Sequence, residues 1–308
     1  SLELITVPLM ARVLHIPCVI YAGTVGPFAD RPSKWLTRLL LNSVDLITLR
    51  ESRSITNIDS LVIKNVPVYV TADAAFLMPP ALSFRVEEIS REVGIPSDRV
   101  LVGFTITYEM AKRYSESHGL NLQNGVAAYM QARADLLDDM VESFNVHIVA
   151  IAHCVELGER DDLAANHEIL RRMRNKKALT IMNFDYRADE LKGIIGECSL
   201  FIGERTHSMI ASTSMSVPTI GVCSRITSSK TRGILGIGMG INEWLVDVET
   251  MKFDEFRRFV KGAFEQRHEL SLGLSERAQV MHEKALLSGY LIAEQFPLLV
   301  RMSAERHR

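Results

Sequence analysis

The chain has 308 residues, of which 47% are hydrophobic and 23% charged, a composition typical of a globular protein with a large core. At about 150 residues per domain, this length predicts two domains. The net charge of −2 gives no electrostatic argument for binding to nucleic acid or to an anionic membrane surface. Any anion that the protein binds must therefore be held by a local group of basic residues.

The cysteines argue against a zinc site or a thiol redox motif. Each of them stands alone inside an apolar run, and no C-x-x-C pair occurs: Cys18, Cys154, Cys198 and Cys223. We expect free, buried thiols in a reducing compartment. No apolar run reaches the roughly 18 residues of a membrane span, and the first residues lack the basic start of a signal peptide. The sequence thus predicts a cytoplasmic protein with no metal ion.

The first part of the chain alternates short apolar runs with helical patterns, which is typical of buried parallel strands in an α/β layer. The apolar runs cover residues 17–23, 44–51 and 66–76. The chain begins in the middle of such a unit, so we expect a first domain that is shortened or lacks its first strands. Pro79 and Pro80 then break the pattern. We expect the linker between the domains at about 77–98.

A second alternation follows. Its strand-like runs are 99–108, 146–154, 178–184, 199–204 and 218–223, with a long helix at about 123–144 and closing helices at roughly 252–269 and 274–297. We predict an α/β protein with two Rossmann-like domains and parallel sheets. The domains comprise residues 1–80 and 81–270. A C-terminal helical segment, 271–308, could pack back on the first domain. Such folds bind ligands at the carboxyl ends of their strands.

Arg205 and His207 stand at one of these strand ends. They follow the run 199–204 and precede a helix pattern rich in small residues. Unpaired N–H groups and the dipole at a helix N-terminus attract anions. An arginine adds a planar fork for phosphate or carboxylate, and a histidine can move a proton near neutral pH. The alternative is that Arg205 pairs with Glu204 or Asp185 and His207 only caps the helix; the position favours the functional interpretation.

The loop 224–233 follows the next strand and carries Arg225, Lys230 and Arg232 among hydroxyl residues. Such a loop could hold a phosphate, and the alternative is a solvated loop without a ligand. The glycine-rich stretch 233–240 fails as a dinucleotide-binding motif, because no strand leads into it and no helix pattern opens from it.

Other strand ends supply further candidates. They are Gly26 in "GTVGPF", Arg50 in "TLRESRS", Asp73 in "TADAAF" and His153 in "IAHCVEL". For Asp73 the default interpretation is a hydrogen bond that holds the fold. Asp161 and Asp162 begin a helix, where carboxylates are usually caps.

These segments, in this order, resemble the polysaccharide pyruvyl transferase family. The matching elements are "GPF" with a downstream Lys34, "DLITLRESRS", "TADAAF", the "DD" after the His153 strand, "YRADELKGIIGECSLFIGERTHSMIAS", and "VPTIGV" with a later Lys230. The similarity runs from about residue 17 to about 250, and 186–222 is its most specific part. The family's glycine-rich N-terminal opening is absent.

The resemblance implies a fold like that of GT-B glycosyltransferases. It also implies transfer of the pyruvyl group of phosphoenolpyruvate to hydroxyls of a cell-surface polysaccharide or its lipid-linked precursor, which forms a ketal. The family's Arg-Leu-His-Ser motif, implicated in donor binding and catalysis, matches Arg205, Thr206, His207 and Ser208, and the family's "LRE" arginine matches Arg50. Two departures are Thr206 in place of leucine and "SRITSSK" in place of a Tyr-Asp-x-Lys loop.

The resemblance therefore assigns roles. His207 and Arg205 are expected to be catalytic, and the donor's phosphate and carboxylate are expected to be held by Arg205, Ser208, Lys230 and Arg50. His207 would deliver a proton to the enol carbon. A carboxylate, Glu204 or Asp73, would balance positive charge at the ketal carbon, and Gly26 and His153 are further candidates for the cleft. This scheme requires phosphoenolpyruvate as donor substrate but no cofactor.

The expected partners are this small donor and a glycan or lipid-linked glycan acceptor, and the latter would bring the protein to a membrane surface. Two alternatives remain open. A nucleotide-sugar-dependent GT-B glycosyltransferase or epimerase would need a pocket for a diphosphate and a base. A non-catalytic member would bind glycan or serve as an assembly partner.

Overall fold

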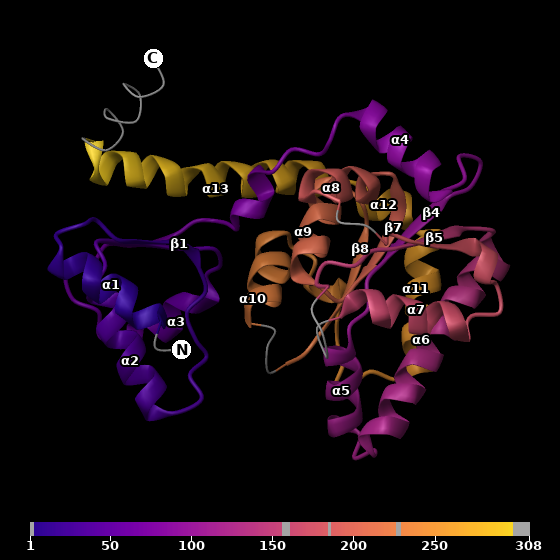
Figure 1. The fold of residues 1–308 in the computed structure, drawn as a ribbon, viewed down its shortest axis with the longest axis horizontal. Coiled ribbons are helices and arrows are strands. Elements are labelled where there is room, and N and C mark those ends of the chain that lie inside the picture. Colours follow the sequence, from indigo (N-terminus) through magenta and orange to yellow (C-terminus); the bar gives the residue numbers. More distant parts are fainter. Residues whose placement is uncertain (1–2, 156–160, 184–185, 226–228, 298–308) are drawn as a thin grey trace. The chain divides into compact units, whose positions relative to one another are not determined.

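The computed structural model describes residues 3–155, 161–183, 186–225 and 229–297. The chain divides into two compact units. Unit 1 comprises residues 1–77 together with 279–308, and unit 2 comprises residues 78–278 (Figure 1). The sequence of the larger unit 2 contains Arg205 and His207, and that of unit 1 contains Arg50 and Asp73.

Unit 1 is built on a three-stranded parallel sheet in the order β1-β2-β3. Its elements are α1 (Glu3–Val13), β1 (Val19–Gly23), α2 (Arg31–Leu41), β2 (Leu46–Leu49), α3 (Arg53–Asp59), β3 (Val68–Val70), a 3-10 turn (Ala74–Leu77) and the larger part of α13 (Leu274–Gln295). The central strand β2 is buried along its whole length, as the apolar run predicts. Helix α13 contacts this unit where His282 Nδ1 lies 3.2 Å from the Phe76 carbonyl oxygen and Ser288 donates to Thr71 Oγ1 at 2.8 Å.

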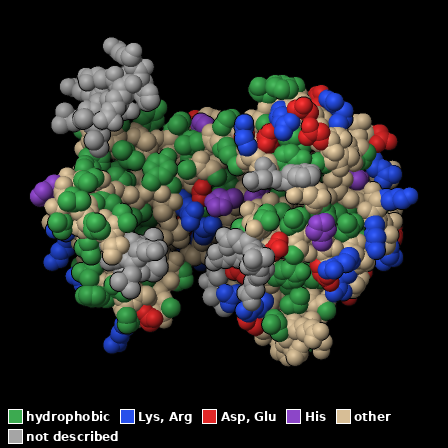
Figure 2. All heavy atoms as spheres, in the orientation of Figure 1, with side chains coloured by type: hydrophobic (Ala, Val, Ile, Leu, Met, Phe, Trp, Pro, Cys, Tyr) green, Lys and Arg blue, Asp and Glu red, His purple; other side chains and the backbone are tan. Residues whose placement is uncertain are grey.

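The surface of unit 1 is unusually apolar. Hydrophobic side chains cover much of its visible face in Figure 2. The large exposed ones on or just after α1 are Val7, Leu9, Met10, Val13, Leu14 and Ile16, and α2 adds Trp35, Leu36 and Leu39. In unit 2 the exposed hydrophobic residues are scattered instead, which is ordinary for a protein surface.

Unit 2 contains a six-stranded parallel sheet in the order β6-β5-β4-β7-β8-β9. The strands are β4 (Leu101–Phe104), β5 (His147–Ala150), β6 (Leu179–Ile181), β7 (Cys198–Gly203), β8 (Thr219–Cys223) and β9 (Leu245–Asp247). The chain starts in the middle at β4, runs to one edge, and returns to the other side of β4 at β7. This is the order of Rossmann folds, and its direction reverses between β4 and β7.

The helices of unit 2 fall into two groups that pack within themselves, one around α6 and one around α8, as expected for layers on the two faces of a sheet. They are α4 (Ser83–Val93), α5 (Tyr108–Ser117), α6 (Leu122–Phe144), α7 (Asp162–Arg172), α8 (Ala188–Gly196), α9 (Thr206–Ser214), α10 (Ser229–Thr231), α11 (Phe253–Glu265) and α12 (Arg267–Ser271), with 3-10 turns at Lys176–Ala178 and Asn242–Trp244. None of the helices in the described part of the chain is long and apolar enough to cross a bilayer.

Three details differ from the sequence-based expectations. The strands are shorter than the apolar runs, because each run continues into the loop after its strand; the run 99–108 contains only the four residues of β4. The stretch from Arg232 to Gly238, where we expected no helix, forms π-helical turns. Strand β9, which has three residues, was not predicted.

Candidate active site

The loops that follow β4 and β7 are tied together by hydrogen bonds. Thr105 Oγ1 accepts the Glu204 N–H at 2.9 Å, and Thr107 donates to Glu204 Oε2 through its N–H at 2.8 Å and its hydroxyl at 3.2 Å. In a Rossmann fold, the crevice for ligands opens where the strand order reverses. The Arg205–His207 motif therefore begins at the position in unit 2 where the fold favours a site.

Glu204 is a buried residue that supports the loops of this site. Its Oε1 accepts the Tyr129 hydroxyl at 2.7 Å and Arg133 Nη2 at 3.2 Å, and its side chain is only 1% exposed. Burial raises the pKa of Glu204, while Arg133 and the hydrogen bonds act in the opposite direction. A side chain so completely enclosed cannot face a substrate, so the expectation that Glu204 balances charge at the ketal carbon has no support in this geometry.

Arg205 is fixed by an aspartate that the sequence did not single out as its partner. Its Nη2 donates to Asp162 Oδ1 at 2.6 Å, and its Nε lies 3.2 and 3.1 Å from the two carboxylate oxygens. The expected alternative partners were Glu204, which binds elsewhere, and Asp185, which lies outside the described residues. Burial lowers the pKa of Arg205, but the contacts with Asp162 outweigh it and raise the pKa overall. Within the described part of the chain, Nη1 makes no hydrogen bond, which leaves one corner of the guanidinium for a ligand.

Asp162 also holds the loop that follows β5. Its Oδ2 accepts the backbone N–H groups of His153 and Cys154 at 3.1 and 3.0 Å, and its side chain is 1% exposed. The neighbouring Asp161 is the residue that caps α7, accepting the Ala164 N–H at 2.9 Å. Of the two carboxylates expected to be caps, only one serves as a helix cap in this way.

His153 is half-buried beside this ion pair. Burial lowers the pKa of His153 to about 4; Asp162 opposes this effect, and His207 and Arg205 add to it. Its Nε2 is buried without a hydrogen-bond partner among the described residues. Because Asp162, Arg205 and His207 all act on the imidazole, the four side chains form one electrostatic cluster, in which His153 is neutral at pH 7.

The motif residues after Arg205 divide into exposed and buried ones. His207 is exposed in the first turn of α9, as a proton donor must be. Ser208 is fully buried, and its hydroxyl donates to the Arg205 carbonyl at 2.7 Å. The structure therefore gives the Ser208 side chain a role in holding the turn, and a direct contact between its hydroxyl and a donor, as the resemblance implied, is not supported.

The basic loop after β8 is mostly structural. Arg225 and Arg232 form ion pairs with Asp247 of β9, with N–O distances of 2.9 and 2.6 Å. This agrees with the alternative of a loop that binds no ligand, as far as these two arginines are concerned. Lys230 is half-buried in α10, and residues 226–228 lie outside the described residues. Lys230 is next to Thr231, whose Oγ1 lies 2.8 Å from Thr206 Oγ1, so α10 is joined to the N-terminus of α9.

Unit 1 also has an arginine with hydrogen-bonded partners at the carboxyl ends of its strands. Arg50, after β2, donates from Nε to Thr24 Oγ1 at 2.7 Å and from Nη1 to Asp73 Oδ2 at 3.0 Å. Asp73 also accepts the Ala75 N–H at 3.0 Å, which is the fold-holding hydrogen bond that we took as the default. Gly26 has a φ of +71°, and a Cβ there would lie 2.6 Å from Asn57 Cγ, so this position requires glycine.

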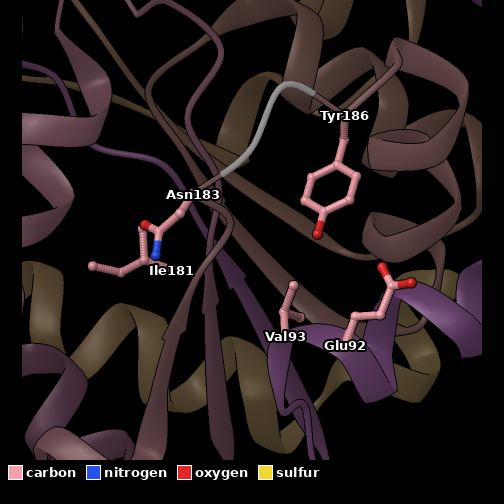
Figure 3. Close-up of a pocket in the computed structure, with 5 residues that line it drawn as sticks. All are labelled: Glu92, Val93, Ile181, Asn183 and Tyr186. Atoms are coloured by element: carbon pink, nitrogen blue, oxygen red, sulfur yellow. The ribbon is translucent and has the colours of Figure 1, made fainter.

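A cavity of about 460 Å³ opens at the carboxyl end of β6. Glu92 and Val93 from the end of α4, Ile181 and Asn183 at the end of β6, and Tyr186 before α8 line it (Figure 3). The Tyr186 hydroxyl is directed toward the Glu92 carboxylate. The sequence did not single out this pocket, although Tyr186 begins the most family-specific segment. Among the described residues, no group of three or more His, Cys, Asp or Glu side chains could hold a metal ion.

Two units with parallel sheets, the larger in Rossmann order, define an α/β protein of the GT-B type, and solved GT-B glycosyltransferases resemble it. HepE from Anabaena, solved with UDP-glucose, matches with a TM-score of 0.60 at 13% identity, over 96% of this chain and 76% of that one. A UDP-forming trehalose-phosphate synthase from Burkholderia xenovorans matches with a TM-score of 0.55 at 14% identity, over 94% of this chain and 70% of that one. At these identities the likeness concerns the fold.

Sequence comparison identifies the family. The family model for polysaccharide pyruvyl transferase matches residues 2–223, and the chain belongs to this family. The amylovoran biosynthesis protein AmsJ of Erwinia amylovora is 20% identical over 297 residues, which cover 93% of this chain. The chain spans 66% of the length of AmsJ.

Proposed function

We propose that the protein transfers the pyruvyl group of phosphoenolpyruvate to two hydroxyls of a sugar in a polysaccharide or its lipid-linked precursor. The observation that carries the proposal is that an exposed histidine, His207, stands two residues after Arg205, just beyond the carboxyl end of β7. Asp162 holds the guanidinium of Arg205 in place. Membership of the pyruvyl transferase family supports it. We further propose a cytoplasmic reaction in which the donor is the only small molecule needed besides the acceptor.

The donor carries a carboxylate and a phosphate, so it needs two groups of hydrogen-bond donors. Nη1 of Arg205 and the first N–H groups of α9 would bind one of these anions, since the first N–H groups of a helix have no acceptor within it. Lys230 of α10, joined to the start of α9 through Thr231 and Thr206, would approach the other. The Asp162 carboxylate holds the guanidinium in place before a donor binds, which lowers the entropic cost of binding.

The proton transfer falls to His207 because it is the exposed histidine of the cluster. As an acid, it would protonate the methylene carbon of the donor, which becomes the methyl group, and leave an electron-poor central carbon. One sugar hydroxyl adds to this carbon, and a second then displaces the phosphate. Two C–O bonds form, while the π bond of the enol and its C–O bond to phosphate break. The proton of the first hydroxyl returns to His207 and that of the second leaves with the phosphate, so that the products are the ketal and inorganic phosphate. His153, with its pKa of about 4, stays neutral and takes no part in the proton transfer.

Substitution of His207 tests the proposal directly. We expect His207→Asn to lower phosphate release from phosphoenolpyruvate in the presence of acceptor by about 100-fold or more, since general acid catalysis is worth that much. Circular dichroism should show an unchanged fold, because His207 is exposed. His167→Asn, which changes an exposed histidine of α7, is the matched control and should retain full activity. Full turnover by His207→Asn would refute the assignment.

The pocket at the end of β6 favours a second candidate function, a nucleotide-sugar-dependent glycosyltransferase. It offers an aromatic ring, an amide and a carboxylate at the same edge of the sheet as the Arg205 cluster. HepE, with the same type of fold, was solved with UDP-glucose. A thermal shift produced by UDP but not by phosphoenolpyruvate, and lost in Tyr186→Ala, would favour this function. A shift with phosphoenolpyruvate alone would favour pyruvyl transfer.

A further inference from the structure

A larger cavity lies at the opposite edge of the unit 2 sheet, where the strands begin. It has a volume of about 770 Å³. Its polar lining comes from the segments that lead into three neighbouring strands. These are Asp98 and Arg99 before β4, His147 at the start of β5, and Arg174, Lys176 and Lys177 before β6. Because the candidate active site lies at the carboxyl ends of the strands, this cavity is a separate feature of the fold.

The lining carries an excess of positive charge. Arg99, Lys176 and Lys177 are exposed, and their side chains have neither an ion pair nor a hydrogen bond within the described part of the chain. Asp98 is the acidic residue of the lining. On a chain with a net charge of −2, three cations without partners around one hollow are a local concentration of charge that attracts an anion.

The other two basic side chains of the lining have partners. Arg174 lies 3.1 Å from Glu142 and 3.9 Å from Asp138 and from Asp135, so its charge is largely compensated. His147 Nε2 lies 2.8 Å from Thr180 Oγ1. Burial lowers the pKa of His147, and Arg99 lowers it further, so the imidazole is neutral at pH 7.

The backbone that leads to Lys176 and Lys177 is held in place by a buried carboxylate of α6. Asp138 of α6 is fully buried and accepts the N–H groups of Arg174 and Asn175 at 2.9 and 2.8 Å. A carboxylate that binds two successive N–H groups fixes the loop that presents Lys176 and Lys177. The cavity is therefore formed by ordered backbone, which keeps the cost of binding low.

We propose that this cavity is a second anion site, which binds a small saccharide bearing a phosphate or a carboxylate. Its volume falls in the range of small-molecule pockets and exceeds what a single phosphate fills. Asn175 of the lining supplies an amide for hydroxyl groups, and Pro96, Val141 and Ala178 supply apolar surface. A hollow favours such a ligand over a flat membrane surface. The inference is independent of the proposed function.

The test uses the full chain with glucose 1-phosphate and glucuronic acid as probes. We expect one of them to bind by calorimetry and to protect the amides of residues 174–178 from hydrogen exchange. The triple variant Arg99→Gln/Lys176→Gln/Lys177→Gln should weaken this binding tenfold or more and abolish the protection. It should retain pyruvyl transfer, so failure of this proposal and failure of the proposed function give different results.

The matched control is Arg258→Gln/Lys261→Gln on α11, which removes two cations that do not line the cavity. It should bind as the unchanged protein does. Binding of glucose 1-phosphate identifies a phosphate as the anion, and binding of glucuronic acid identifies a carboxylate. The proposal is overturned if neither probe protects residues 174–178, or if the triple variant binds as tightly as the unchanged protein. Equal affinity for inorganic phosphate, or protection only by vesicles of anionic lipid, would also overturn it.

Discussion

The two units place an arginine–aspartate pair at the carboxyl ends of their strands, and the pairs differ in how firmly they are held. In unit 1, Arg50 makes one hydrogen bond to Asp73 and one to the hydroxyl of Thr24. In unit 2, Arg205 makes a bidentate contact with Asp162, which is itself bound to two backbone N–H groups. Both carboxylates are buried, so the difference lies in the number of contacts: Asp162 binds two nitrogens of its arginine and two backbone N–H groups, whereas Asp73 binds one of each.

The first way to test this difference is to remove the charge of Asp162. We expect Asp162→Asn to lower the free energy of unfolding by about 3–4 kcal/mol, because it leaves the largely buried guanidinium without its counter-charge. Pyruvyl transfer should fall by about 100-fold or more, since Arg205 loses its fixed position. Chemical denaturation and phosphate release measure the two effects. Asp161→Asn is the control, and loss of about 1 kcal/mol or less is expected for this cap.

The pH dependence of stability should distinguish the unit 2 cluster from the rest of the molecule. The pKa of His153 is about 4 in the folded protein, against 6.5 when unperturbed. Above pH 6.5 the imidazole is neutral in both the folded and the unfolded protein, so it does not affect the free energy of unfolding. As the pH falls from 6.5 to about 4, the unfolded chain binds the proton first, so stability should fall by up to about 3 kcal/mol.

Denaturation of His153→Gln and of the unchanged protein at pH 7 and pH 4.5 checks this prediction. The variant should lose less stability between the two pH values. An equal loss in both proteins would mean that His153 titrates normally.

The smallest effect is expected in unit 1. Asp73→Asn should lower the free energy of unfolding by about 1 kcal/mol or less, since Arg50 remains 21% exposed and keeps its bond to Thr24. A loss as large as that of Asp162→Asn would remove the distinction between the pairs.

The sequence predicted the parallel strands and the place of Arg205, because apolar runs and helix starts are local patterns. It could not predict the partner of Arg205, because that contact joins positions 43 residues apart. The loops concerned follow β5 and β7, which have β4 between them in the sheet. Asp162 also looked like its neighbour Asp161, and only the fold separates the carboxylate that caps a helix from the one that binds Arg205.

The burial of Glu204 and Ser208 could not be predicted from the sequence either. Glu204 directly precedes the motif and Ser208 is its last residue, and in sequence both look as accessible as the exposed His207. The partners of Glu204, Tyr129 and Arg133, lie on α6 and are 75 and 71 residues away along the chain. Polar residues around a motif therefore divide into those that meet a ligand and those that support the turn, and this division depends on tertiary contacts.

One carboxylate, that of Asp162, is shared by the β5 loop and by the arginine of the β7 motif. Sharing makes the two segments thermodynamically coupled: a ligand that draws Arg205 away from Asp162 also weakens the hold on the backbone of His153 and Cys154. By reciprocity, anything that rearranges the β5 loop changes the affinity of Arg205 for its anion. Events at either end of this contact would thus be coupled through the shared carboxylate.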